Sequence, residues 1–324
     1  RTCNFGTEMY WHGILDYSGR ENRRLLEVTD VSRKVKAVQE AAGAVYHAQV
    51  GILKDYDNIW DCQTDRWHER VDRVSGKSLF SALQRAHVPF DYVYLDEKTG
   101  LQDLQKYEVL FYPHASILTP VRTELLEQYV AQGGKLVMGC RTGYKEENGK
   151  CVTDRLPGLA SELTGTDIPE YSFVAPDDGK VMAEWDGQKM EAAVFNDLLA
   201  PAGENAEVLA VYTDSCYAGT PALIRNRFGK GEAYYFGGAF AMDTAELFIR
   251  KLGIGEPYAE ILDIPAECEL AVREKDGVRY LFVLNYEKHS VEVTLKRELR
   301  ELLSGESCCG IQELEPYGVR VYRV

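Results

Sequence analysis

The feature that most constrains the fold is an alternation of short apolar runs with helical stretches between residues 50 and 140. Four runs rich in β-branched and aromatic residues have the composition of buried strands: 50–55, 90–96, 107–113 and 135–140. Helical periodicity occupies 78–87 and 120–134, and the second stretch starts with Thr119 as its N-cap and Pro120 as its first residue. This alternation predicts a mostly parallel sheet wrapped by helices, and hence an α/β fold of the flavodoxin-like type.

The second half of the chain predicts more strands, a hairpin and one further helix. Residues 221–240 predict a β-hairpin with a Gly-Lys-Gly turn at 229–231, and a helix is expected over 244–253. Polar and apolar residues then alternate, which predicts a small antiparallel β domain over 259–324. Other strand-like segments lie around 171–194 and 207–214.

The N-terminal residues follow a different pattern. A helix is expected over 21–42, because apolar residues recur at spacings of three and four: Leu25, Val28, Val31, Val35, Val38 and Ala42. Just before it, Glu8, Trp11 and His12 lie within five positions. A strand end with such residues, then a loop and a helix, is how a (β/α)8 barrel presents substrate contacts. We therefore expect one remnant βα unit of a TIM barrel, with Arg1 as an internal junction.

Composition and charge exclude several classes of function. A hydrophobic content of 45% and a charged content of 27% are ordinary for a globular protein. The net charge of −14 argues against a nucleic-acid partner, and no apolar run is long enough for a membrane span. The eight cysteines are scattered without a C-x-x-C pair, which indicates a reducing cytoplasm and neither a disulfide framework nor a metal site. No cofactor is implied.

The strongest candidate for ligand binding is the group formed by Glu8, Trp11 and His12. A carboxylate can accept hydrogen bonds from paired sugar hydroxyls, and an imidazole can donate or accept another. The indole of Trp11 can stack on the apolar face of a sugar ring. The alternative is a loop that is merely anchored to the helix that follows it.

Three other groups have both a functional and a structural interpretation. Asp55, Asp57 and Asp61 follow a strand and could bind Mg²⁺ or Ca²⁺, but turn formation and helix capping are favoured. Cys140 follows the strand at 135–140 and could mimic a nucleophile, yet no basic partner is evident. An aromatic patch is expected to serve in packing or an interface: Trp60, Trp67 and His68.

Eight strings distributed along the chain carry a family resemblance. In chain order they are FGTEMYWHGILD, ILKDYDNIWD, PFDYVYLD, YEVLFYPHA, GGKLVMGCRTGY, FNDLL, GKGEAYYFGGAF and YLFVLNY. Together they resemble the C-terminal part of glycoside hydrolase family 42 β-galactosidases, in the family's order and over essentially all 324 residues.

The resemblance implies three domains and an assembly. Residues 1–43 would be the last unit of the catalytic TIM barrel, 44–258 a flavodoxin-like trimerisation domain, and 259–324 the C-terminal antiparallel β domain. The family's middle domain is similar to class I glutamine amidotransferases without their catalytic machinery. The family's trimerisation domain also implies that the protein assembles as a homotrimer.

The resemblance also implies the chemistry of the parent enzyme. Family members hydrolyse terminal β-galactosides with retention, using two glutamates on barrel strands, both expected upstream of residue 1. No catalytic residue is therefore assigned within this chain. Glu8 matches the family's galactose-binding glutamate, and His12 or Trp11 matches the neighbouring substrate contact. The metal-binding cysteines of some members lie in the absent barrel, and none of the eight here inherits that role.

The leading hypothesis is thus the C-terminal portion of a retaining β-galactosidase, inactive by itself, that supplies trimerisation and part of the galactose pocket. A second hypothesis is a non-catalytic assembly or interaction module. A third is a Cys140-dependent hydrolase of the amidotransferase-like type.

Overall fold

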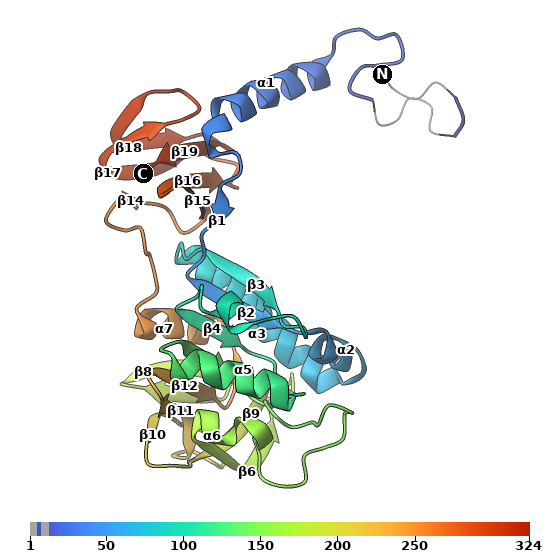
Figure 1. Ribbon diagram of the computed structural model, residues 1–324, viewed down its shortest axis with the longest axis vertical. Coiled ribbons are helices and arrows are strands. Elements are labelled where there is room, and N and C mark those ends of the chain that lie inside the picture. The colour runs from blue at the N-terminus through green and yellow to red at the C-terminus, as the bar shows by residue number, and fades with distance from the viewer. Residues whose placement is uncertain (1–4, 8–12) are drawn as a thin grey trace. The chain divides into compact units, whose positions relative to one another are not determined.

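The computed structural model describes residues 5–7 and 13–324, apart from the side chains of Trp67 and His68. The chain divides into two compact units (Figure 1). The central unit contains Ala48–Tyr258, and the terminal unit combines Arg1–His47 with Ala259–Val324.

A ten-stranded sheet forms the middle of the central unit, in the order β13-β8-β7-β10-β11-β12-β5-β4-β2-β3. A separate antiparallel pair is formed by β6 (Thr166–Phe173) and β9 (Phe195–Pro201). The strands of the large sheet are β2 (Val50–Lys54), β3 (Phe90–Tyr94), β4 (Val109–Tyr112), β5 (Lys135–Met138), β7 (Met182–Trp185), β8 (Gln188–Ala193), β10 (Ala206–Tyr212), β11 (Pro221–Phe228), β12 (Gly231–Phe236) and β13 (Ala239–Phe240).

The direction of these strands shows that the predicted fold class is wrong. Parallel pairing extends from β3 through β2, β4 and β5 to β12, as expected. From β12 onward, β11, β10, β7, β8 and β13 all pair antiparallel, so the sheet is mixed and not of the mostly parallel flavodoxin-like type. The cause lies in the connections. The β7–β8 and β11–β12 links are two-residue turns, whereas a parallel pair needs a crossover of a dozen residues or more.

Helices cover both faces of this sheet. One hydrophobic cluster joins the sheet to α3 and α7, and a second joins it to α5 and α6. Successive residues of β4 point to opposite clusters, with Phe111 in the first and Leu110 in the second. The helices of this unit are α2 (Tyr56–Thr64), α3 (Arg66–Arg85), α4 (Leu101–Leu104), α5 (Pro120–Ala131), η2 (Gly158–Ala160), α6 (Ser161–Thr164) and α7 (Met242–Leu252).

Of the helices predicted in the central unit, the one at Pro120 begins as expected, whereas α3 begins at Arg66 and α7 at Met242, before the predicted 78 and 244. The Thr119 side chain accepts a hydrogen bond from the Arg122 backbone N–H at 3.3 Å, and Pro120 is the first residue of α5. Asp55 caps α2 in the same way, by accepting from the Asn58 N–H at 2.9 Å. Gly253 ends α7 with a φ of 69°, a conformation that glycine adopts without strain.

The terminal unit contains an antiparallel sheet in which every pair of strands is antiparallel. A two-residue turn at Asp276-Gly277 joins β15 to β16, as predicted for a hairpin. The strands are β1 (Val45–Tyr46), β14 (Leu262–Asp263), β15 (Cys268–Lys275), β16 (Val278–Asn285), β17 (Val291–Glu301), β18 (Ser307–Leu314) and β19 (Val319–Arg323).

The N-terminal helix α1 (Arg23–Ala37) also belongs to this unit and is followed by the short η1 (Gln39–Ala41). It is shorter than the predicted 21–42, because the chain changes from α to 3-10 geometry after Val38. None of the fifteen residues of α1 is buried, and its apolar Val31 and Val35 are 57% and 62% exposed. The strand end of the predicted remnant βα unit, which carries Glu8, Trp11 and His12, lies outside the described residues.

Candidate functional site

The central unit presents an unusual surface along strand β3, which we call the aromatic edge. β3 ends the strand order, and one of its sides carries no further strand within the described part of the chain. Tyr92 and Tyr94 are 41% and 50% exposed on this strand, and Trp60 on α2 is 59% exposed. The members of the aromatic edge are Tyr56, Trp60, Phe80, Phe90, Tyr92 and Tyr94.

Ring contacts connect these side chains into one surface. The Tyr56 ring stacks on Tyr94 with centroids 5.8 Å apart, and it contacts Trp60 at 5.5 Å. On the other side, Phe90 contacts Tyr92 at 6.1 Å. Phe90 also meets Phe80 of α3 edge-on at 5.5 Å. A row of exposed aromatic side chains at an open sheet edge is the composition expected of a protein–protein contact.

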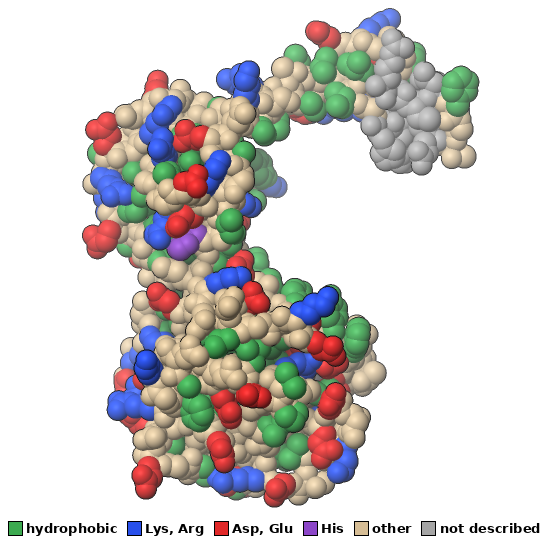
Figure 2. Space-filling view, in the orientation of Figure 1, with side chains coloured by type: hydrophobic (Ala, Val, Ile, Leu, Met, Phe, Trp, Pro, Cys, Tyr) green, Lys and Arg blue, Asp and Glu red, His purple; other side chains and the backbone are tan. Residues whose placement is uncertain are grey.

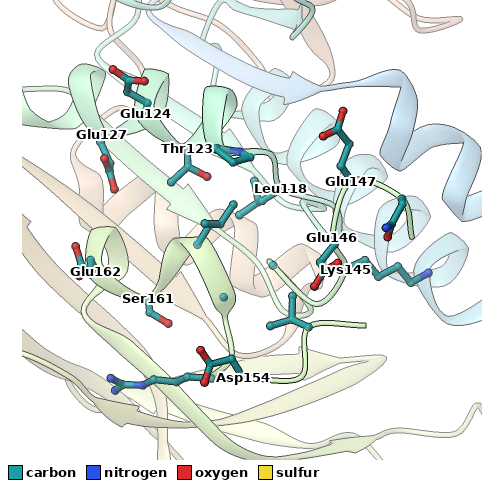
Figure 3. A pocket seen from close by; sticks show the side chains of 17 residues that line it. Leu118, Thr123, Glu124, Glu127, Lys145, Glu146, Glu147, Asp154, Ser161 and Glu162 are labelled. Atoms are coloured by element: carbon teal, nitrogen blue, oxygen red, sulfur yellow. The ribbon is translucent and has the colours of Figure 1, made fainter. Parts of the chain in front are cut away.

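A second surface feature is a groove beside α5 and α6, which we call the acidic groove (Figure 3). Its volume is about 1180 Å³, and it is open to solvent. Apolar side chains such as Leu118 and Leu159 contribute to its lining. The carboxylates that line it are Glu124, Glu127, Glu146, Glu147, Asp154 and Glu162.

The cations of the acidic groove are already paired. Lys145 donates to Asp61 at 2.6 Å and to Asp65 at 3.3 Å, and the Arg155 Nε lies 3.0 Å from Asp167. None of these three aspartates lines the groove. Burial, and then the charges of Glu162 and Glu124, raise the pKa of Glu127. Glu146 has a counter-charge in Lys150, whose Nζ lies 3.4 Å from its carboxylate oxygen. Glu124, Glu127 and Glu162 form no ion pair within the described part of the chain, and their charges repel one another.

The aspartates after β2 form an ion-pair network. The buried Asp55 accepts from the Asn58 amide at 2.8 Å, from the Tyr112 hydroxyl, and from Arg122 at 3.3 Å. Arg122 also donates to Asp57 at 2.5 Å. The predicted helix-capping role is confirmed for Asp55, whereas Asp57 and Asp61 form ion pairs with Arg122 and Lys145. Among the described residues, no group of three or more His, Cys, Asp and Glu side chains is arranged to hold a metal ion.

Cys140 lies beside a buried carboxylate, in surroundings opposite to those of a nucleophile. Asp197 accepts from the Arg141 N–H at 2.8 Å and from the hydroxyls of Tyr144 and Tyr235 at 2.7 Å each. Burial, and then the charge of Asp197, raise the pKa of the Cys140 thiol well above its usual value. A reactive cysteine needs a lowered pKa. The environment of Cys140 is thus structural.

The structure also contains a thiol–imidazole pair that was not predicted from the sequence. The Cys62 Sγ lies 3.4 Å from the His114 Nδ1, and both side chains are buried. The two residues are 52 positions apart, and no motif links them. Burial, and then the charges of Asp72 and Asp61, raise the pKa of Cys62 to about 12, so this thiol also stays protonated at neutral pH.

The predicted sugar contacts Glu8, Trp11 and His12 all lie outside the described residues. Of the predicted aromatic patch, Trp60 belongs to the aromatic edge, and the side chains of Trp67 and His68 are likewise not described. In the described part of the chain, no helix combines the length and the hydropathy needed to cross a membrane.

Two protein-family models match this chain, one in each unit. Residues 48–256 match the family model described as the β-galactosidase trimerisation domain. Residues 268–324 match the β-galactosidase C-terminal domain.

Known proteins match over the whole chain. β-Galactosidase Pbg of Clostridium perfringens is 29% identical, and the match covers 98% of this chain and 47% of that protein. β-Galactosidase BgaA of Clostridium cellulovorans is also 29% identical, over 100% of this chain and 48% of its own length. The chain thus spans about half the length of the curated relatives it matches.

Solved structures show the same fold. A family 42 β-galactosidase from G. stearothermophilus superimposes with a TM-score of 0.84 at 23% identity, covering 99% of this chain and 47% of that one. A β-galactosidase from Bacillus circulans sp. alkalophilus gives a TM-score of 0.83 at 24% identity, covering 98% and 48%. With the family model matching well over half of its residues, the chain belongs to glycoside hydrolase family 42, whose β-galactosidase trimerisation and C-terminal domains it contains.

Proposed function

We propose that this chain is the assembly and C-terminal part of a retaining β-galactosidase that works as a cytoplasmic homotrimer. The observation that carries the proposal is the match of 48–256 to the β-galactosidase trimerisation domain. The aromatic edge supports it, because exposed aromatic side chains at an open strand are suited to contact between subunits. Free thiols such as Cys216 and Cys309 are consistent with a reducing compartment.

The proposal assigns residues 1–43 to the last unit of a catalytic barrel, 44–258 to assembly and 259–324 to the C-terminal β domain. Helix α1 supports the first assignment. Its exposed valines lie on the stripe that periodicity predicts to face a core, and an uncovered apolar stripe of this kind marks an interaction surface. The barrel would supply that core together with the acid/base and nucleophile glutamates.

The proposal also places Glu8 at the galactose pocket, with His12 or Trp11 beside it. Glu8 would accept hydrogen bonds from sugar hydroxyls as a charged acceptor, an interaction that contributes about 1.5–3 kcal/mol. Changing Glu8 to Gln in the complete gene product should therefore lower kcat/KM for a β-galactoside by about 10- to 100-fold. The exposed Glu21→Gln variant is the control and should retain wild-type kinetics. Unchanged kinetics in Glu8→Gln would remove this residue from the pocket.

The proposed division of labour is tested by measuring hydrolysis of a chromogenic β-galactoside. The purified 324-residue chain should give no turnover, and the complete gene product that contains it should hydrolyse the substrate. Robust turnover by the chain alone would contradict the proposal, since the reacting carboxylates would then have to lie within it. An inactive complete gene product would favour the second candidate, a non-catalytic assembly module built around the aromatic edge.

A further inference from the structure

Two surfaces of the central unit carry opposite charge. One is the exposed face of α3 next to the aromatic edge, and the other is the acidic groove. Figure 2 shows hydrophobic and acidic side chains interspersed on the visible face of the central unit. Both surfaces belong to the 48–256 segment that matches the trimerisation domain.

The exposed face of α3 forms what we call the basic stripe. Arg66, Arg73 and Lys77 recur at spacings of seven and four, so they lie on one side of the helix. Glu69 is the one carboxylate on this side, and its oxygen lies 3.8 Å from Arg73 in a solvent-exposed pair. The stripe ends at Phe80, through which it joins the aromatic edge. It therefore combines net positive charge with aromatic surface.

The acidic groove has the complementary character. Six carboxylates line it, and the two cations in its lining are paired with aspartates that lie outside it. Figure 3 shows Glu124, Glu127 and Glu162 along one side and Glu146 and Glu147 along another. Leu159, which is 46% exposed, adds apolar surface to the lining of the groove. A ligand that brings several cations and an apolar edge would relieve the repulsion there.

We propose that the basic stripe of one copy of this chain docks into the acidic groove of the next copy. The two surfaces differ, so the contact between copies is heterologous. Repeated contacts of this kind form a closed ring when the rotation that relates neighbouring copies is a whole fraction of a full turn. Three copies would then use three identical contacts. This inference rests on the proposed homotrimer and specifies the surfaces that build it. Charge complementarity also makes the contact sensitive to salt.

Charge reversal on the two surfaces tests the pairing, with sedimentation equilibrium of the full 324-residue chain as the measurement. The basic-stripe variant is Arg73→Glu with Lys77→Glu, and the groove variant is Glu124→Lys with Glu162→Lys. Each should weaken subunit association by about 100-fold. The variant with all four changes restores opposite charges and should recover the wild-type association.

The matched control reverses two exposed lysines elsewhere in the central unit, Lys189→Glu with Lys230→Glu, and should assemble as the wild type does. Circular dichroism establishes that each variant is folded, and the milder glutamine substitutions at the same positions replace any variant that is not. Wild-type association in either double variant, or no recovery in the fourfold variant, would overturn the pairing. A wild-type chain that is monomeric would instead overturn the homotrimer.

Discussion

At the scale of single residues, Asp55 shows how a helix cap can also anchor a long-range network. Asp55 is 1% exposed, and its carboxylate receives hydrogen bonds from the Asn58 backbone and amide, from Tyr112 and from Arg122. Capping is a local property, so the sequence predicts it. The contact with Arg122 spans 67 positions and depends on how β2 and α5 pack, which no local pattern reveals.

Removing Arg122 tests this network. Arg122→Met leaves the buried Asp55 carboxylate without its counter-charge, and we expect the free energy of unfolding to fall by about 3 kcal/mol. Urea denaturation measures it. As a control, Arg33→Met breaks an exposed pair with Asp30 and should leave the denaturation midpoint unchanged. Equal midpoints for the two variants would show that the network does not stabilise the central unit.

The two buried thiols lead to a prediction about pH. Burial raises the pKa of Cys62 to about 12, so this thiol remains protonated from pH 7 to 9.5, and burial also raises the pKa of Cys140 well above its usual value. Iodoacetamide reacts with the thiolate, so neither cysteine should be labelled in the folded chain anywhere in this range. The exposed Cys216 and Cys309 should be labelled, as peptide mass spectrometry will show. Labelling of Cys140 as fast as Cys216 would support the cysteine-hydrolase hypothesis.

At the scale of elements, the sequence predicted the individual strands better than their arrangement. The runs 50–55 and 135–140 correspond to β2 and β5, and the hairpin over 221–240 contains β11 and β12. Strand composition and turn residues are local signals. The mixed sheet arises because β12 pairs parallel with β5 and antiparallel with β11, a choice that depends on contacts about 100 residues apart.

Close packing at the start of β12 can be tested with one methyl group. A Cβ at Gly231 would collide with the backbone carbonyl oxygens of Gly134 and Val130. Backbone cannot move aside as a side chain can, so Gly231→Ala should lower the free energy of unfolding by about 3 kcal/mol. Gly179 has no neighbouring atom within 4 Å of the same position, and Gly179→Ala should be neutral or slightly stabilising. Equal stabilities in thermal denaturation would contradict this packing.

At the scale of the whole molecule, the surfaces proposed for assembly lie in the described part of the chain, while the proposed sugar contacts lie outside the described residues. The sequence indicated Trp60 as packing or interface, but it could not indicate Tyr92 and Tyr94. Their exposure depends on β3 being the last strand of the sheet. The acidic groove could not be predicted from the sequence either. Its carboxylates come from α5, α6 and the segment between β5 and α6, which only the fold brings together.

The central claim is that this chain is the trimerising part of a β-galactosidase, and its molecular mass in solution tests that claim most directly. Light scattering on the purified chain at micromolar concentration should give three times the chain mass of 36.6 kDa. A mass of 36.6 kDa that persists as the concentration is raised tenfold would contradict the account.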